Sequence, residues 1–196
     1  MKKVVFTAIG TKPLLYHKFN IEVLSNKTKT KSGTTGNDPE EWKTTVHVDG
    51  KRLFFPHDYW LSCIKDGGKY VKQGRGTISN KLAGCMSILS ERTYLNIELP
   101  DLIDKLETSD MPRDPTKSIF LDVRGVKNPA TKGKNVRYRL GVKAGWQTQV
   151  ELEFDDTVLS KDDIRKALEA AGKFSGIGDG RSIGYGRFEV VDVEFS

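Results

Sequence analysis

Glycine and basic residues gather in one run, 172–187, near the C-terminus. Within the run lie Lys173, Gly176, Gly178, Gly180, Arg181, Gly184, Gly186 and Arg187. Glycine lets a backbone take positive φ and approach another group closely, and arginine offers a planar fork of donors that suits phosphate. The run therefore predicts a backbone surface that contacts an anion. The alternative interpretation is a flexible glycine loop that caps a helix.

Two common phosphate-binding motifs are absent from the sequence. A G-x-G-x-x-G pattern that starts at Gly176 would need glycine where Arg181 stands. The run also follows a helical pattern and precedes a strand, which is the reverse of a dinucleotide-binding turn. No G-x-x-x-x-G-K-[ST] occurs in the chain. We therefore exclude a Rossmann site and a P-loop.

The sequence predicts neither a metal site nor a cofactor. The only histidines are His17, His47 and His57, and none has a second ligand at metal spacing. No nucleophile elbow or Cys-His arrangement is present. The chain is therefore more simply explained as a binding protein than as an enzyme.

One acid–base candidate is His17, which follows the first predicted strand. An imidazole can take up a proton near neutral pH. Beside Tyr16 or Lys18, it could assist attack of an RNA 2′-hydroxyl without a metal. The alternative is that His17 is a surface residue or a nucleic-acid contact, and a single histidine favours that alternative.

Two further stretches are rich in basic residues. The first contains Lys69, Lys72, Arg75 and Lys81, and the second contains Arg124, Lys127, Lys132, Lys134, Arg137, Arg139 and Lys143. Such residues neutralise a phosphate backbone without sequence preference, and aromatic faces between them can stack bases. Tyr70, Trp42 and Tyr138 are candidate stacking platforms, with core packing as the alternative for each. The clustering predicts a single-stranded RNA or DNA partner.

The composition agrees with an acidic partner. The chain has 196 residues, a formal net charge of +6 and 37% hydrophobic residues, so it can bury a core and still present a basic surface. Cys63 and Cys85 lack zinc-ligand spacing and suggest reduced thiols. No apolar run approaches the length of a membrane helix. We expect a cytoplasmic protein with no membrane partner.

Predicted strands and helices flank these basic stretches along the sequence. Strands are predicted at 3–9, 86–89, 93–99, 149–154 and 188–195, with helices at 58–65 and 160–171 and a long basic β-hairpin at about 124–143. The second helix has a capping-box start at Ser160 and a left-handed C-cap at Gly172. The polar segment at about 25–43 is an insertion. This order predicts an α+β fold, with an elaborated ferredoxin-like or RRM-like βαββαβ core in a single domain, 1–196.

The chain resembles the RAMP superfamily of CRISPR RNA-binding proteins. The resemblance lies in the glycine loop and closing strand (176–188), the Phe-Phe-Pro-His lead into the first helix (54–57) and Gly-Thr-Lys-Pro-Leu-Leu after the first strand (10–15). The hairpin at 124–139 resembles the thumb of the family's filament-forming subunits, and the layout is similar to small phage or prophage relatives. The resemblance implies an RRM-like core that binds single-stranded nucleic acid, with self-association along the strand left open. Some members cut RNA with an early-loop aspartate, for which Asp38 is a candidate, although its Asn-Asp-Pro-Glu context looks like an ordinary turn.

Three hypotheses follow from these observations. The leading one is a non-catalytic, RAMP-like protein that tracks the phosphate backbone with the glycine run and both basic stretches. The second is a metal-independent endoribonuclease that uses His17. The third is a phage-encoded protein that docks on the subunits of a host CRISPR effector complex.

Overall fold

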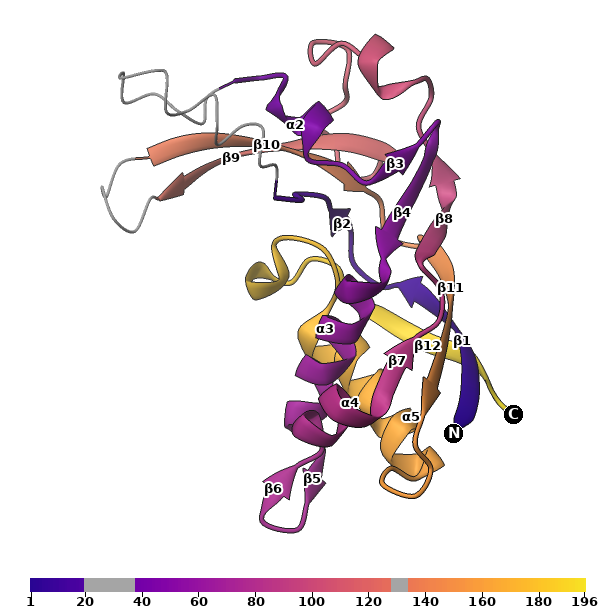
Figure 1. Ribbon diagram of the computed structural model, residues 1–196. Coiled ribbons are helices and arrows are strands. Elements are labelled where there is room, and N and C mark those ends of the chain that lie inside the picture. The colour runs from indigo at the N-terminus through magenta and orange to yellow at the C-terminus, as the bar shows by residue number, and fades with distance from the viewer. Residues whose placement is uncertain (20–37, 128–133) are drawn as a thin grey trace.

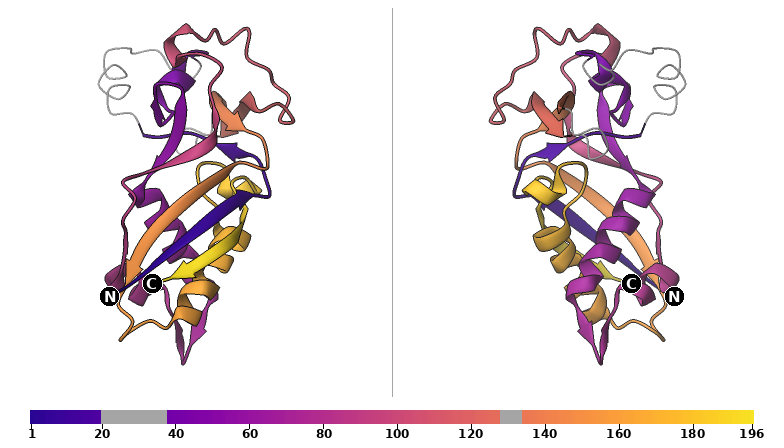
Figure 2. Two further views of the ribbon diagram at one scale, coloured as in Figure 1. Left: turned by 90° about the vertical axis from the view of Figure 1, so that its right-hand side faces the viewer. Right: turned by 90° about the vertical axis from the view of Figure 1, so that its left-hand side faces the viewer.

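A four-stranded sheet in which all neighbouring strands run antiparallel forms the core of the computed structural model, which describes residues 1–19, 38–127 and 134–196. The strand order is β12 (Phe188–Phe195), β1 (Lys2–Gly10), β11 (Gln147–Phe154) and β7 (Met86–Ile88). Helix α3 (His57–Gly67) lies between β1 and β7 in the chain, and α5 (Lys161–Ala170) lies between β11 and β12. Figures 1 and 2 show both helices on one face of the sheet. The mixed α+β class is therefore confirmed.

The core follows from the alternation of side chains along the strands. Val4, Phe6 and Ala8 of β1 point toward the helices and are fully buried, as expected for a strand with one covered face. Helix α3 contributes Trp60, Cys63 and Ile64, and α5 contributes Ile164, Ala167 and Leu168. In each helix these residues are spaced three and one apart, which places them on one face.

The opposite face of the sheet is open and acidic. In the observed register, Lys3, Val5 and Ile9 of β1 lie beside glutamates of the neighbouring strands. These glutamates are Glu151, Glu153, Glu189 and Glu194. The face that the helices leave available is therefore not part of the basic surface.

Helix α5 begins as predicted but ends differently. The Ser160 hydroxyl accepts a hydrogen bond from the Asp163 N–H at 3.1 Å, and the Asp163 carboxylate accepts one from the Ser160 N–H at 3.0 Å, which is a capping box. The predicted left-handed C-cap at Gly172 is wrong. The helix continues as a π-helical turn, η3 (Ala171–Ser175), and the positive φ of 73° occurs at Gly176. Gly172 instead lets the turn pack closely on the Phe188 carbonyl.

Smaller sheets lie beyond one end of the core sheet (Figure 1). One contains β2 (Leu14–Leu15), β10 (Lys134–Val142) and β9 (Ile119–Lys127), and another contains β3 (Val48–Asp49), β4 (Arg52–Pro56) and β8 (Arg92–Glu98). Strands β9 and β10 occupy the region predicted as a basic hairpin, and their pairing begins earlier, at Ile119.

The remaining elements surround this frame. They are α2 (Glu41–Thr44), η1 (Gly68–Tyr70), β5 (Lys72–Gln73), β6 (Gly76–Thr77), α4 (Ser79–Cys85), η2 (Ile103–Lys105) and η4 (Arg181–Ile183). Gly84 lies within α4. No described helix has the length and apolar character needed to cross a membrane.

The predicted insertion at about 25–43 is only partly visible, because residues 20–37 lie outside the described residues. Its last part enters α2, where Trp42 is fully buried and donates a hydrogen bond from Nε1 to the Thr108 hydroxyl at 2.8 Å. Trp42 is therefore a core residue, and its candidacy as a stacking platform is wrong.

Candidate nucleic-acid interface

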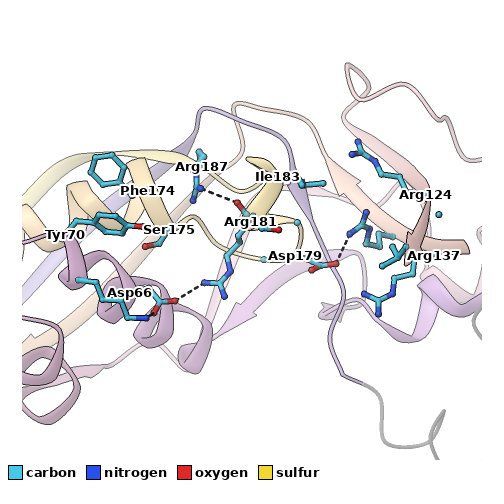
Figure 3. A pocket seen from close by; sticks show the side chains of 17 residues that line it. Asp66, Tyr70, Arg124, Arg137, Phe174, Ser175, Asp179, Arg181, Ile183 and Arg187 are labelled. Atoms are coloured by element: carbon cyan, nitrogen blue, oxygen red, sulfur yellow. Dashed lines mark hydrogen bonds and ion pairs between the residues drawn. The ribbon is translucent and has the colours of Figure 1, made fainter. Parts of the chain in front are cut away.

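A groove of about 920 Å³ lies between the glycine run, the β9–β10 hairpin and the C-terminal ends of the α3 and α5 helical segments. Six of its lining residues are basic, namely Lys69, Arg124, Arg137, Arg139, Arg181 and Arg187. Only two are acidic, Asp66 and Asp179. We call this feature the basic groove (Figure 3). It unites residues from all three basic stretches of the sequence.

The glycine run is held by the protein's own backbone. All five glycines from Gly176 to Gly186 have positive φ, as predicted. However, a side chain would not fit at Gly178 or at Gly186. A Cβ at Gly178 would clash with the Leu15 carbonyl, and a Cβ at Gly186 would clash with the Ile177 carbonyl. The Asp179 N–H also donates to the Leu15 carbonyl at 2.8 Å. The close approach that glycine allows is therefore made to the protein itself at these two positions, whereas a Cβ at Gly184 would meet open space.

Arg139 joins the hairpin to the glycine run. Its guanidinium lies 2.7 Å from the Asp122 carboxylate and 3.0 Å from that of Asp179. Arg139 is only 5% exposed, and Asp122 is equally well buried. We had expected Arg139 to grip a nucleic-acid strand, but its donors are occupied by these two carboxylates. We therefore assign it a structural role.

The pKa of Asp179 shows how strong this pairing is. Burial alone would raise the pKa of the carboxyl group, but hydrogen bonds from Arg139 and from the Gly180 N–H outweigh it, so the pKa lies below its ordinary value. Asp179 is therefore a carboxylate at neutral pH, and the ion pair is intact there.

Arg124 and Arg137 are the other two arginines of the hairpin that line the groove. They are direct partners in the β9–β10 register, so their side chains leave the hairpin on the same face. Arg124 contacts Asp122 at 2.7 Å and also the ring and hydroxyl of Tyr185. Arg137 has no carboxylate partner within the described part of the chain. Like charges directly opposite each other are unfavourable unless an anion lies nearby.

The glycine run supplies two more arginines to the groove. Arg181 contacts Asp66 at 3.3 Å, and the same carboxylate accepts from Lys69 at 2.7 Å. Arg187 donates from Nη2 to the Arg181 carbonyl at 3.2 Å. Arg187 Nη1 and the Ser175 hydroxyl are buried and have no hydrogen-bond partner among the described residues. Buried donors of this kind are normally satisfied by water or a ligand.

Other predicted contacts lie away from the basic groove. Lys72, Arg75 and Lys81 are exposed, but they lie on or beside the β5–β6 hairpin and α4, which point away from the β9–β10 hairpin in Figure 1. Lys72 and Lys173 line a second hollow instead. The side chains of Lys127 and Lys134, and the whole of Lys132, lie outside the described residues. The basic groove therefore contains only part of the predicted site.

The two catalytic candidates do not line the groove. His17 is half-buried, and burial, followed by the nearby Arg137, lowers its pKa, so its neutral form is favoured at neutral pH. The Asp38 carboxylate accepts a hydrogen bond from the Glu40 N–H at 2.9 Å in the turn that precedes α2. This is the ordinary turn that its sequence context suggested.

Several groove residues could not be found by the search for basic residues. Asp66 and Asp179 were missed because they are acidic, and so was Asp122, which lies behind the groove lining and pairs with Arg124 and Arg139. The alternation of side chains along a strand could have pointed to Asp122. Asp122 lies two residues before Arg124, so the two side chains share one face of the strand. Phe174 was missed because the sequence predicted that the helix ends at residue 171, before Phe174.

Three solved structures resemble this fold. A chain of the type III-B Cmr-beta complex bound to cognate target RNA gives a TM-score of 0.50 at 14% identity, covering 99% of this chain and 60% of that chain. A chain of a type IV-B CRISPR complex gives 0.48 at 10%, covering 99% and 90%. Cmr6 from Pyrococcus furiosus gives 0.49 at 9%, covering 97% and 99%. The chain thus spans about 60% of the length of the first structure.

These likenesses concern the fold. The mixed α+β arrangement with several antiparallel sheets is similar to the fold of the matched chain in the Cmr-beta complex. No protein-family model and no curated protein matches the chain.

The Arg139 ion pairs predict a stability difference between two arginines that share Asp122. Arg139→Ala should lower the free energy of unfolding by about 3–5 kcal/mol, because it removes a buried guanidinium that pairs with both Asp122 and Asp179. Arg124→Ala, the control, removes a half-exposed pair and should cost about 1 kcal/mol or less. Urea denaturation measures both, and equal losses would contradict the structural role of Arg139.

The glycine contacts predict a second matched comparison. Gly184→Ala should cost about 1–2 kcal/mol, because alanine resists positive φ. Gly186→Ala should cost about 3 kcal/mol or more, because its Cβ must also displace the Ile177 carbonyl. Thermal unfolding reports the difference. If the two variants melt together, the glycine run is not packed on its own backbone as described.

Proposed function

We propose that this protein binds single-stranded nucleic acid and holds its phosphate backbone in the basic groove. The observation that carries the proposal is the placing of Arg124 opposite Arg137, on the groove side of the hairpin. Arg181 and Arg187 line the same groove. Four guanidiniums offset by few carboxylates are poorly arranged for stability alone, but they suit a chain of phosphates.

The fold supports the same proposal. A β12-β1-β11-β7 order with α3 and α5 as crossovers is the order expected of a ferredoxin-like βαββαβ unit in one elaborated domain. The glycine run that follows the last helix and the basic hairpin are the parts that resemble the RAMP superfamily. One similar structure is of a complex bound to target RNA. We therefore favour RNA as the strand, with CRISPR effector subunits or further copies of the chain as protein partners.

The groove residues divide into two roles. Four residues would contact phosphates, namely Lys69, Arg137, Arg181 and Arg187. Arg124 would also contact a phosphate, from its position over the Tyr185 ring. Arg139 with its two carboxylates keeps the hairpin at the distance that the strand requires. Cleavage by His17 is not favoured, because His17 does not line the groove. The groove accordingly supports binding rather than catalysis.

Salt dependence tests the proposal. The affinity for a labelled single-stranded RNA should fall linearly with salt on logarithmic axes, with a slope of about −0.7 for each phosphate contact. Arg137→Ala with Arg181→Ala should weaken binding and make the slope less steep by about 1.4. Fluorescence anisotropy at several salt concentrations measures both quantities.

The matched control is Lys51→Ala, which removes an exposed lysine that pairs with Asp101 outside the groove. It should change neither the affinity nor the slope. The proposal fails if the wild-type chain does not bind single strands at low salt. The assignment of the groove fails if the double arginine variant keeps the wild-type slope.

A further inference from the structure

Two exposed aromatic rings lie at one end of the basic groove. Tyr70 is 59% exposed and Phe174 is 42% exposed. Their ring centroids are 4.8 Å apart with an interplanar angle of 32°. Figure 3 shows them at the end away from Arg124 and Arg137, with Arg181 and Arg187 in between. Large aromatic side chains normally bury most of their surface, so an exposed pair requires an explanation.

The two rings come from helical turns that are distant in the sequence. Tyr70 ends η1, directly after α3, and Phe174 lies in the π-helical turn η3, directly after α5. The π-helical geometry is rare and occurs frequently at functional sites. Close packing of Gly172 against Phe188 fixes the start of this turn. The pair is therefore held in place by the ends of both core helices.

The aromatic pair separates two hollows. Tyr70 and Phe174 line the basic groove on one side and a hollow of about 510 Å³ on the other. The second hollow is also lined by Lys72, Lys166 and Lys173, with Glu169 as its only acidic residue. The Lys173 ammonium lies 5.3 Å from the centre of the Phe174 ring. Cations thus flank the rings on both sides.

We infer that Tyr70 and Phe174 form a stacking platform for a nucleobase, over which the strand passes from the basic groove into the second hollow. The inference rests on the proposed function and extends its site. A single strand presents a base with an aromatic face and a phosphate on each side of that base, which matches rings flanked by cations. Lysines around an apolar surface favour this anionic ligand over an apolar peptide. Lys72 and Lys173 thereby gain a role that the basic groove alone does not give them.

Replacing the rings tests the inference. Tyr70→Leu with Phe174→Leu keeps apolar bulk and removes both aromatic faces, so the affinity for single-stranded RNA should fall roughly 5- to 100-fold. The slope of affinity against salt should not change, because no phosphate contact is lost. Tyr70→Phe keeps the ring and should bind like the wild type. Leu102→Ala, at a residue with the same 42% exposure as Phe174 but outside both hollows, is the control for surface changes.

A second measurement changes the RNA and begins with the wild-type chain. RNAs are compared in which one base is replaced by an abasic site, at a different position in each RNA. The wild-type chain should bind more weakly when the abasic site replaces the base that stacks on the rings. The leucine variant should lose this position dependence. If the wild type binds RNA but tolerates abasic sites everywhere, or if the leucine variant binds as well as the wild type, the stacking platform is wrong and the proposed function stands. If the wild type binds no single strand, both are overturned.

Discussion

The position of the basic groove depends on the buried ion pairs of Arg139. One guanidinium contacts Asp122 within the hairpin and Asp179 in the glycine run, so one side chain fixes the spacing of two segments that are distant in the sequence. Burying charges is costly unless they are paired and fully hydrogen-bonded. This network meets that condition, because Arg124 occupies the remaining oxygen of Asp122. The other arginines of the groove are positioned relative to this network.

The glycine run acts as a rigid wall of the groove. Its positive-φ residues let it fold against Leu15 and Ile177, and its backbone hydrogen bonds extend to Pro13 and Leu15. Arg181 and Arg187 are therefore presented from a fixed loop. A preformed site loses less conformational entropy on binding than a flexible one. The π-helical turn at the start of the run contains Phe174, so the wall and the aromatic pair form one continuous surface.

Local patterns predicted much of this structure. The Ser160 capping box, the strand predicted at 3–9 and the start of the helix predicted at 160–171 all depend on the types and spacing of residues that are near neighbours in sequence. Long-range contacts could not be predicted in this way. Arg139 and Arg137 have different roles because only Arg139 pairs with Asp122 and Asp179. The exposure of Phe174 depends on where α5 ends against β12. The sequence left Trp42 open as a stacking platform or a core residue, because its hydrogen-bond partner, Thr108, lies far along the chain.

The four glutamates on the open face of the sheet have an effect on how a ligand approaches. Because they lie on a different face from the groove arginines, positive and negative charge are separated across the protein, which gives it an electric dipole. If the proposed nucleic-acid ligand binds in the groove, this separation of charge would favour its approach to the groove over its approach to the sheet face. The ligand would then be oriented before it makes any contact.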